Sequence, residues 1–133
     1  MTKMFSVSHR VRLSETDALG VVYYGQYLTY FDVSRLELLR DAGITLQFLK
    51  ERGLGFVAAE AVCRYRSSAK FDDVLTLRVK VERIGRSSVV YSHEVRDGER
   101  TVAEGRVTDV MVGRDGRPLP IDRDIRDRLS KHI

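Results

Sequence analysis

The residues best suited to chemistry lie in one short run near the N-terminus, residues 10–27. It places a carboxylate, Asp17, before two glycines, Gly20 and Gly25, at the start of a stretch with helical periodicity. Glycine lets the backbone turn sharply and approach a ligand closely. The unpaired amides of a helix's first turn carry partial positive charge and could hold a developing oxyanion. Such a loop suits acyl transfer, in which Asp17 attacks the acyl carbon or activates a water molecule.

The same spacing also has a purely structural interpretation. An aspartate that precedes a helix commonly caps it or forms a turn, and Glu15 could be a solvated charge. Considered by spacing alone, Asp17 is better explained by this structural role. The choice between the two roles therefore needs information beyond the local pattern.

Other kinds of catalytic site are poorly represented in the chain. It contains neither a Gly-x-Ser-x-Gly nucleophile elbow nor a phosphate-binding glycine loop. The three histidines, at 9, 93 and 132, stand singly, which favours structural or solvated roles. Cys63 is the only cysteine, so an intrachain disulfide is excluded, and its flanks favour a small apolar filler on a strand over a nucleophile. We expect no metal site and no resident cofactor.

The elements that would position the loop follow from hydrophobic periodicity. Helical spacing predicts a long helix over residues 25–42, with Gly43 as its stop signal, and a shorter helix over 45–52. Alternation of apolar and polar residues predicts five strands, and a charged helix closes the chain. Because helices and strands are segregated, we expect an α+β fold in which an antiparallel five-stranded sheet curls around the long helix, as one domain over residues 1–133. The predicted strands are 7–13, 56–66, 74–83, 88–96 and 101–112, and the last helix is 122–131.

One predicted strand carries an unusual face of small residues, namely Ala103, Gly105 and Val107. Such a face indicates that a bulky group lies across it.

Composition limits the partners. The formal net charge is +4, but the basic residues are scattered, which disfavours nucleic-acid binding. No run approaches the roughly 20 apolar residues that a membrane span requires, and the N-terminus has no segment typical of a signal peptide. We therefore expect a cytoplasmic protein without a membrane span.

The run at residues 10–27 resembles the signature of the 4-hydroxybenzoyl-CoA thioesterase family. That signature is a basic residue, an aliphatic one, four further residues, Thr-Asp, two residues, and Gly-Val-Val. It is filled without a gap by Arg10, Val11, Thr16, Asp17, Gly20, Val21 and Val22. The likeness continues over nearly the whole chain, at Tyr27, Leu28, Arg35, Glu37 and the Phe71-Asp72-Asp73 segment.

The resemblance implies a hot-dog fold, a homodimer or homotetramer, and hydrolysis of an acyl-CoA thioester to the free acid and CoA. It assigns Asp17 as the catalytic carboxylate and the backbone amides of Tyr24 and Gly25 as the oxyanion hole. Many bacterial relatives have a histidine where this chain has Gly25, and the 4-hydroxybenzoyl branch has Pro-Asn where it has Gly25-Gln26. Asp17 is therefore expected to act with backbone dipoles alone.

The resemblance also suggests where the substrate binds. Coenzyme A enters only as part of the substrate, and its phosphates are expected near Arg83, Arg86 and Ser87, with Lys70 and Arg66 in addition. For each of these residues, ordinary surface solubility is an equally good explanation. The acyl pocket is expected between helix and sheet near a subunit interface, formed by Gly20, Val21, Tyr27, Phe31, Asp32, Phe56 and Val57, the last two from a neighbouring subunit.

Three members of the expected pocket have simpler alternative roles. Tyr27 and Phe31 have the spacing of core residues. Asp32, if buried, would need a partner such as a phenolic substrate hydroxyl, but an ion pair with Arg35 is the simpler expectation.

Two functions of other classes remain as alternatives. A non-catalytic module that binds acyl thioesters or acyl carrier protein would keep the pocket without hydrolysis. A hot-dog dehydratase is disfavoured, because such relatives use a histidine paired with an acidic helix residue and residues 10–92 contain no histidine. The acyl group itself is left open.

Overall fold

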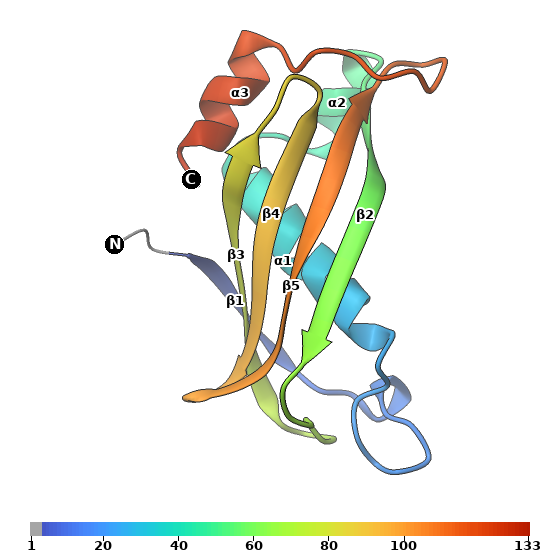
Figure 1. The fold of residues 1–133 in the computed structure, drawn as a ribbon, viewed down its shortest axis with the longest axis vertical. Coiled ribbons are helices and arrows are strands. Elements are labelled where there is room, and N and C mark those ends of the chain that lie inside the picture. The colour runs from blue at the N-terminus through green and yellow to red at the C-terminus, as the bar shows by residue number, and fades with distance from the viewer. Residues whose placement is uncertain (1–3) are drawn as a thin grey trace.

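The computed structural model describes residues 4–133 of the chain and contains five strands and three α-helices in this range (Figure 1). The predicted order of one strand, two helices, four strands and a last helix is confirmed. The elements are β1 Phe5–Arg10, α1 Gln26–Asp41, α2 Leu46–Glu51, β2 Gly55–Tyr65, β3 Val74–Ile84, β4 Ser88–Asp97, β5 Arg100–Val112 and α3 Arg123–Ser130.

The first strand is the one element whose predicted range is clearly wrong. β1 ends at Arg10 instead of residue 13, because Leu13–Glu15 turns into a short 3-10 helix. This turn directs the chain into the loop that carries Asp17. The other predicted boundaries agree with the structure to within about one residue.

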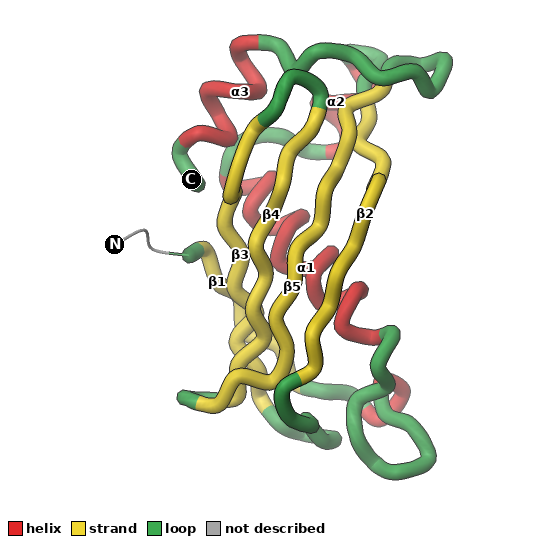
Figure 2. Tube along the Cα trace, in the orientation of Figure 1, coloured by secondary structure: helices red, strands yellow, loops and turns green. Residues whose placement is uncertain are grey.

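The strands form a single antiparallel sheet in the order β1-β3-β4-β5-β2. The long helix α1 runs along one face of the twisted sheet (Figures 1 and 2). β2 follows the helices in sequence but pairs with β5, so it forms the far edge of the sheet. The predicted α+β hot-dog architecture, a five-stranded sheet wrapped around one central helix, is confirmed.

The core lies between α1 and the inner face of the sheet. One cluster of buried residues surrounds Tyr30 and Phe31, and a second surrounds Leu38 near the C-terminal end of the helix. Burial of a large apolar side chain contributes about 1.5–3 kcal/mol, so these two clusters hold α1 on the sheet. At Gly105 a Cβ atom would lie 2.8 Å from a ring carbon of Phe31, which confirms that a bulky group covers the small-residue face.

The end of α1 follows the predicted signal. Gly43 comes directly after the C-cap residue Ala42 and has a φ of +76°, a conformation that glycine adopts at little cost. No helix in residues 4–133 combines the length and the apolar character needed to cross a membrane.

Candidate active site

The loop between the 3-10 helix and α1 is held by its own backbone. The Asp17 amide donates to the Val21 carbonyl at 2.9 Å, and the Tyr23 amide donates to the Glu15 carbonyl at 2.9 Å. Gly20 closes the tip with a φ of +81° and donates to the Asp17 carbonyl at 3.0 Å. The two arms of the loop thus pair like a short hairpin and present Asp17 close to its tip.

Asp17 is exposed at this tip. Its Oδ1 atom accepts a hydrogen bond from the Leu19 amide at 2.9 Å, while Oδ2 has no protein partner within residues 4–133. Asp17 therefore forms a turn, as the structural interpretation suggested, but it does not cap α1. One carboxylate oxygen remains accessible to a substrate or to water.

The N-terminus of α1 provides amide donors beside this loop. Its N-cap is Gly25, which offers no side-chain acceptor, and the Gln26 amide donates to the Tyr23 carbonyl at 2.9 Å. In the described part of the chain, the amides of Tyr24 and Gly25 have no protein acceptor. They lie at the positive end of a 16-residue helix, where an oxyanion would be stabilised.

Glu15 is not the solvated charge that the sequence allowed. Its carboxylate is partly buried and accepts hydrogen bonds from the Tyr30 hydroxyl at 2.8 Å and the Arg12 amide at 3.0 Å, and His9 Nε2 lies 2.9 Å away. Burial raises the pKa of Glu15, but the hydrogen bonds from Arg12, His9 and Tyr30 outweigh it and leave that pKa below its usual value. Glu15 thereby ties the loop to both β1 and α1.

The sequence contained a weak signal for this cluster. His9 lies with Val7 on the partly buried face of β1, and the alternation continues to Val11 just beyond the strand, so the imidazole needs a polar partner. The identity of that partner could not be inferred, because Glu15 lies beyond a turn that the periodicity did not reveal.

Several tyrosine rings pack against one another around the start of α1. The rings of Tyr23 and Tyr24 lie 4.7 Å apart, and Tyr65 on β2 packs edge-on against Tyr24 and Tyr27. The Tyr65 hydroxyl donates to the Tyr24 carbonyl at 3.0 Å. Sequence reasoning did not identify Tyr65, because a tyrosine near the end of a strand is ordinary in composition.

Several predicted site residues do converge on the loop. Gly20 and Val21 belong to it, Tyr24 and Gly25 follow directly, and Lys70 pairs with Val21 in an isolated bridge. Lys70 is exposed, so its ammonium group is available near the loop.

The other predicted substrate contacts lie elsewhere within one chain. Phe56 and Val57 start β2, and Arg83, Arg86 and Ser87 surround the β3–β4 turn, both at the end of the sheet opposite the Asp17 loop (Figure 1). The Arg66 guanidinium bonds to the Glu104 carboxylate at 2.5 Å. A single chain therefore does not bring Phe56, Val57 or the β3–β4 turn to Asp17, whereas Arg66 follows the end of β2 on the loop side but is paired with Glu104.

The helix residues predicted for the acyl pocket take their simpler roles. Tyr27 and Phe31 are only 3% and 1% exposed and belong to the core. Asp32 has a side chain 59% exposed and forms an ion pair with Arg35, so the burial that would have required a substrate hydroxyl is not found.

Arg35 is the centre of a buried polar cluster. Its Nε atom lies 3.4 Å from Asp109 and its Nη1 atom 3.3 Å from His93 Nε2. Burial, with the Arg35 charge as a second cause, lowers the pKa of His93 to about 3. The imidazole is therefore neutral and stacks on Phe31 with ring centroids 4.4 Å apart. This cluster joins the middle of α1 to β4 and β5.

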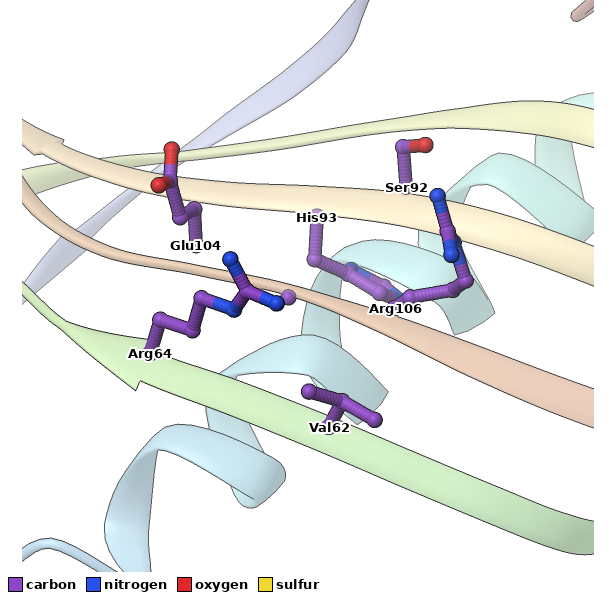
Figure 3. Close-up of a pocket in the computed structure, with 7 residues that line it drawn as sticks. Val62, Arg64, Ser92, His93, Glu104 and Arg106 are labelled. Carbon is purple, nitrogen blue, oxygen red and sulfur yellow. The ribbon is translucent and has the colours of Figure 1, made fainter.

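A hollow of about 390 Å³ lies on the sheet, lined by residues of β2, β4 and β5 (Figure 3). Arg64 and Glu104 lie on the side of the strands away from α1, and the same hollow reaches Arg106, which is paired with Glu82 at 3.0 Å. No group of three or more potential metal ligands is found among residues 4–133. The loop at Asp17, rather than this hollow, combines a carboxylate with unpaired amides.

Comparisons with known proteins find a matching family model, related chains and a similar solved structure. A model of the Thioesterase-like superfamily matches residues 11–129. The chain is 30% identical to the acyl-CoA thioester hydrolase YbgC of Escherichia coli over 84% of each chain. It is 35% identical to the acyl-CoA thioesterase YbgC of Haemophilus influenzae over 68% of each. The crystal structure of a hypothetical protein from Aquifex aeolicus superposes with a TM-score of 0.89, at 30% identity, covering 94% of this chain and 98% of that one.

Proposed function

Because this chain belongs to the thioesterase-like superfamily, we propose that it hydrolyses acyl-CoA thioesters to a free carboxylic acid and CoA. One observation carries the proposal: an accessible Asp17 carboxylate lies in the loop that leads directly to the unpaired amides of Tyr24 and Gly25. The names of the two YbgC relatives support an acyl-CoA substrate. A small or medium acyl group is the expected substrate.

Asp17 has two chemically complete routes. As a nucleophile, its carboxylate attacks the acyl carbon, the CoA thiolate leaves, and water hydrolyses the resulting mixed anhydride. As a general base, it removes a proton from the water that attacks the same carbon. In both routes negative charge develops on the carbonyl oxygen, where the Tyr24 and Gly25 amides would donate to it. One such donor is typically worth about 100- to 1,000-fold in rate.

The test is replacement of Asp17 by Asn, with CoA release measured by a thiol reagent across a panel of acyl-CoAs. We expect turnover to fall by about 100- to 10,000-fold, the usual contribution of a general base or more. Asp115→Asn is a matched control, because Asp115 Oδ1 accepts from the amide two residues later at 3.0 Å, as Asp17 Oδ1 does. The control variant should hydrolyse at the wild-type rate.

Two outcomes would count against the proposal. Undiminished turnover in the Asp17→Asn protein would remove Asp17 from the mechanism. Binding of acyl-CoA by the wild-type protein without hydrolysis of any thioester would favour the non-catalytic binding module instead.

We further propose a homodimer or homotetramer in the cytoplasm. The edge strand β2 supports this assembly, because Val57 and Val62 on it are 54% and 40% exposed. A neighbouring subunit is also the simplest source of Phe56, Val57 and the basic β3–β4 turn near a second Asp17. Sedimentation of a monomer at micromolar concentration would contradict the assembly.

A further inference from the structure

The peptide between Tyr24 and Gly25 is the middle of a tight turn. The Gln26 amide donates to the Tyr23 carbonyl at 2.9 Å, which closes a four-residue turn over residues 23–26. Gly25 has φ −70° and ψ −20°, values that fit a type I turn. The middle peptide of such a turn has a second orientation, type II, in which its carbonyl and its amide point in nearly opposite directions.

Glycine at this position makes both orientations accessible. A type II turn requires a positive φ at its third residue, and Gly25 is that residue. Most other residues would disfavour the second orientation by their Cβ atom. In this chain, a reversal of the peptide would turn the Gly25 N–H away from the side on which it now lies, so a contact made by this peptide can select between the two orientations.

The Tyr65 hydroxyl makes that contact. It donates to the Tyr24 carbonyl at 3.0 Å, from a position 41 residues away on β2. This carbonyl and the Gly25 N–H belong to the same planar trans peptide and point in opposite directions. A hydrogen bond that fixes the carbonyl therefore also fixes the N–H, and it polarises the N–H as a donor.

Tyr65 is itself well placed for this role. Its ring packs edge-on against the buried Tyr27 at 5.6 Å between centroids, and its backbone pairs with Ala103 of β5. Burial raises the pKa of Tyr65, so the hydroxyl keeps its proton at neutral pH. The side chain is half exposed, so loss of the hydroxyl alone has little effect on folding.

We propose that Tyr65 is a positioning residue, whose hydroxyl holds the Tyr24–Gly25 peptide in the one orientation that presents the Gly25 N–H to the substrate carbonyl. This inference rests on the proposed thioester hydrolysis at the same loop. It assigns β2 a part in catalysis that the signature run at residues 10–27 does not contain.

The first test is Tyr65→Phe, which keeps the ring and removes only the hydroxyl. We expect kcat to fall about fivefold to twentyfold, less than direct loss of an oxyanion donor, with KM changed by less than about twofold. Tyr91→Phe is the control, because the Tyr91 hydroxyl is buried without a hydrogen-bond partner within residues 4–133. Equal turnover in the Tyr65→Phe and wild-type proteins would overturn the inference.

A second variant tests the orientation itself. Alanine at position 25 disfavours the positive φ of the reversed peptide. In a Gly25→Ala background the Tyr65 hydroxyl therefore contributes less to fixing the peptide orientation. In that background we expect Tyr65→Phe to lower kcat by less than about twofold. An alanine Cβ would lie 2.8 Å from the Tyr23 ring, and comparison within the background removes the effect of any shift this causes. If Tyr65→Phe lowered kcat by the same factor with glycine and with alanine at position 25, the Tyr65 hydroxyl would not control the peptide orientation.

A third measurement is independent of turnover. The ¹⁵N resonance of the Gly25 amide responds to hydrogen bonding at the preceding carbonyl, so it should move in Tyr65→Phe and stay in place in Tyr91→Phe. If the resonance moves but the wild-type protein releases no CoA, the proposed hydrolysis fails and the positioning contact stands. If CoA is released but neither the resonance nor kcat changes in Tyr65→Phe, the inference alone fails.

Discussion

Tyr30→Phe tests whether the Glu15 cluster stabilises the loop that carries Asp17. Tyr30 is completely buried on α1, and its hydroxyl donates to the Glu15 carboxylate at 2.8 Å. The phenylalanine ring occupies the same space, so the substitution removes one hydrogen bond and creates almost no cavity. Glu15 keeps its contacts with His9 and the Arg12 amide.

The expected cost follows from the charge and burial of the acceptor. A hydrogen bond to a charged group contributes about 1.5–3 kcal/mol, and Glu15 is partly shielded from the water that could replace the lost donor. For a chain of this size, 1 kcal/mol corresponds to roughly 4 °C in Tm. We therefore expect the free energy of unfolding to fall by about 1.5–3 kcal/mol and Tm to fall by roughly 6–12 °C.

The assay is urea and thermal unfolding at pH 7, followed by circular dichroism, with Tyr91→Phe as the matched control. Both residues are fully buried tyrosines, but the Tyr91 hydroxyl has no partner among the described residues, so its removal should leave stability unchanged or raise it slightly. Equal losses of stability in the two variants would refute the reasoning, because the effect would then follow from burial instead of the bond to Glu15.

Two further predictions concern the core. Burial lowers the pKa of His93 to about 3, against about 6.5 when unfolded, so the unfolded chain binds the extra proton and stability should fall as pH decreases from 6.5 toward 3. The free energy of unfolding should fall by up to about 1.4 kcal/mol per pH unit in this range. In urea titrations between pH 6.5 and 4.5, His93→Gln should make this dependence on pH weaker. At Gly105 a Cβ would lie 2.1 Å from the Val62 carbonyl oxygen, so Gly105→Ala should lower the free energy of unfolding by about 3 kcal/mol. Gly55→Ala, whose Cβ meets only an ordinary contact at 3.9 Å, should change stability by less than a third of that.

Much of the fold could be predicted because its signals are local. Alternation marked β3, β4 and β5, helical spacing marked α1, and Gly43 marked where α1 ends. The small side chain at Gly105 even indicated that a bulky group crosses the sheet, since packing across a sheet constrains residue size. β1 was predicted to continue too far because a strand and the turn that follows it can share the same alternation.

The candidate site was predicted only in part. The loop with Asp17, Gly20 and Gly25 was visible because its residues are neighbours in sequence, and because Asp17 and Gly20 match a signature. The predicted contacts at Arg83 and Phe56 lie at the far end of the sheet within one chain, because a sheet separates the two ends of its strands by their full length.

The sequence by itself determined which α-helices and strands form, where all of them except β1 end, and which loop carries the carboxylate, because periodicity and turn chemistry act over a few residues. Only the tertiary structure decided what holds that loop and its amides in place. Glu15 meets Tyr30 across 15 residues, and Tyr65 meets the Tyr24 carbonyl across 41. Such contacts depend on how α1 and β2 pack together, and no local pattern encodes that arrangement.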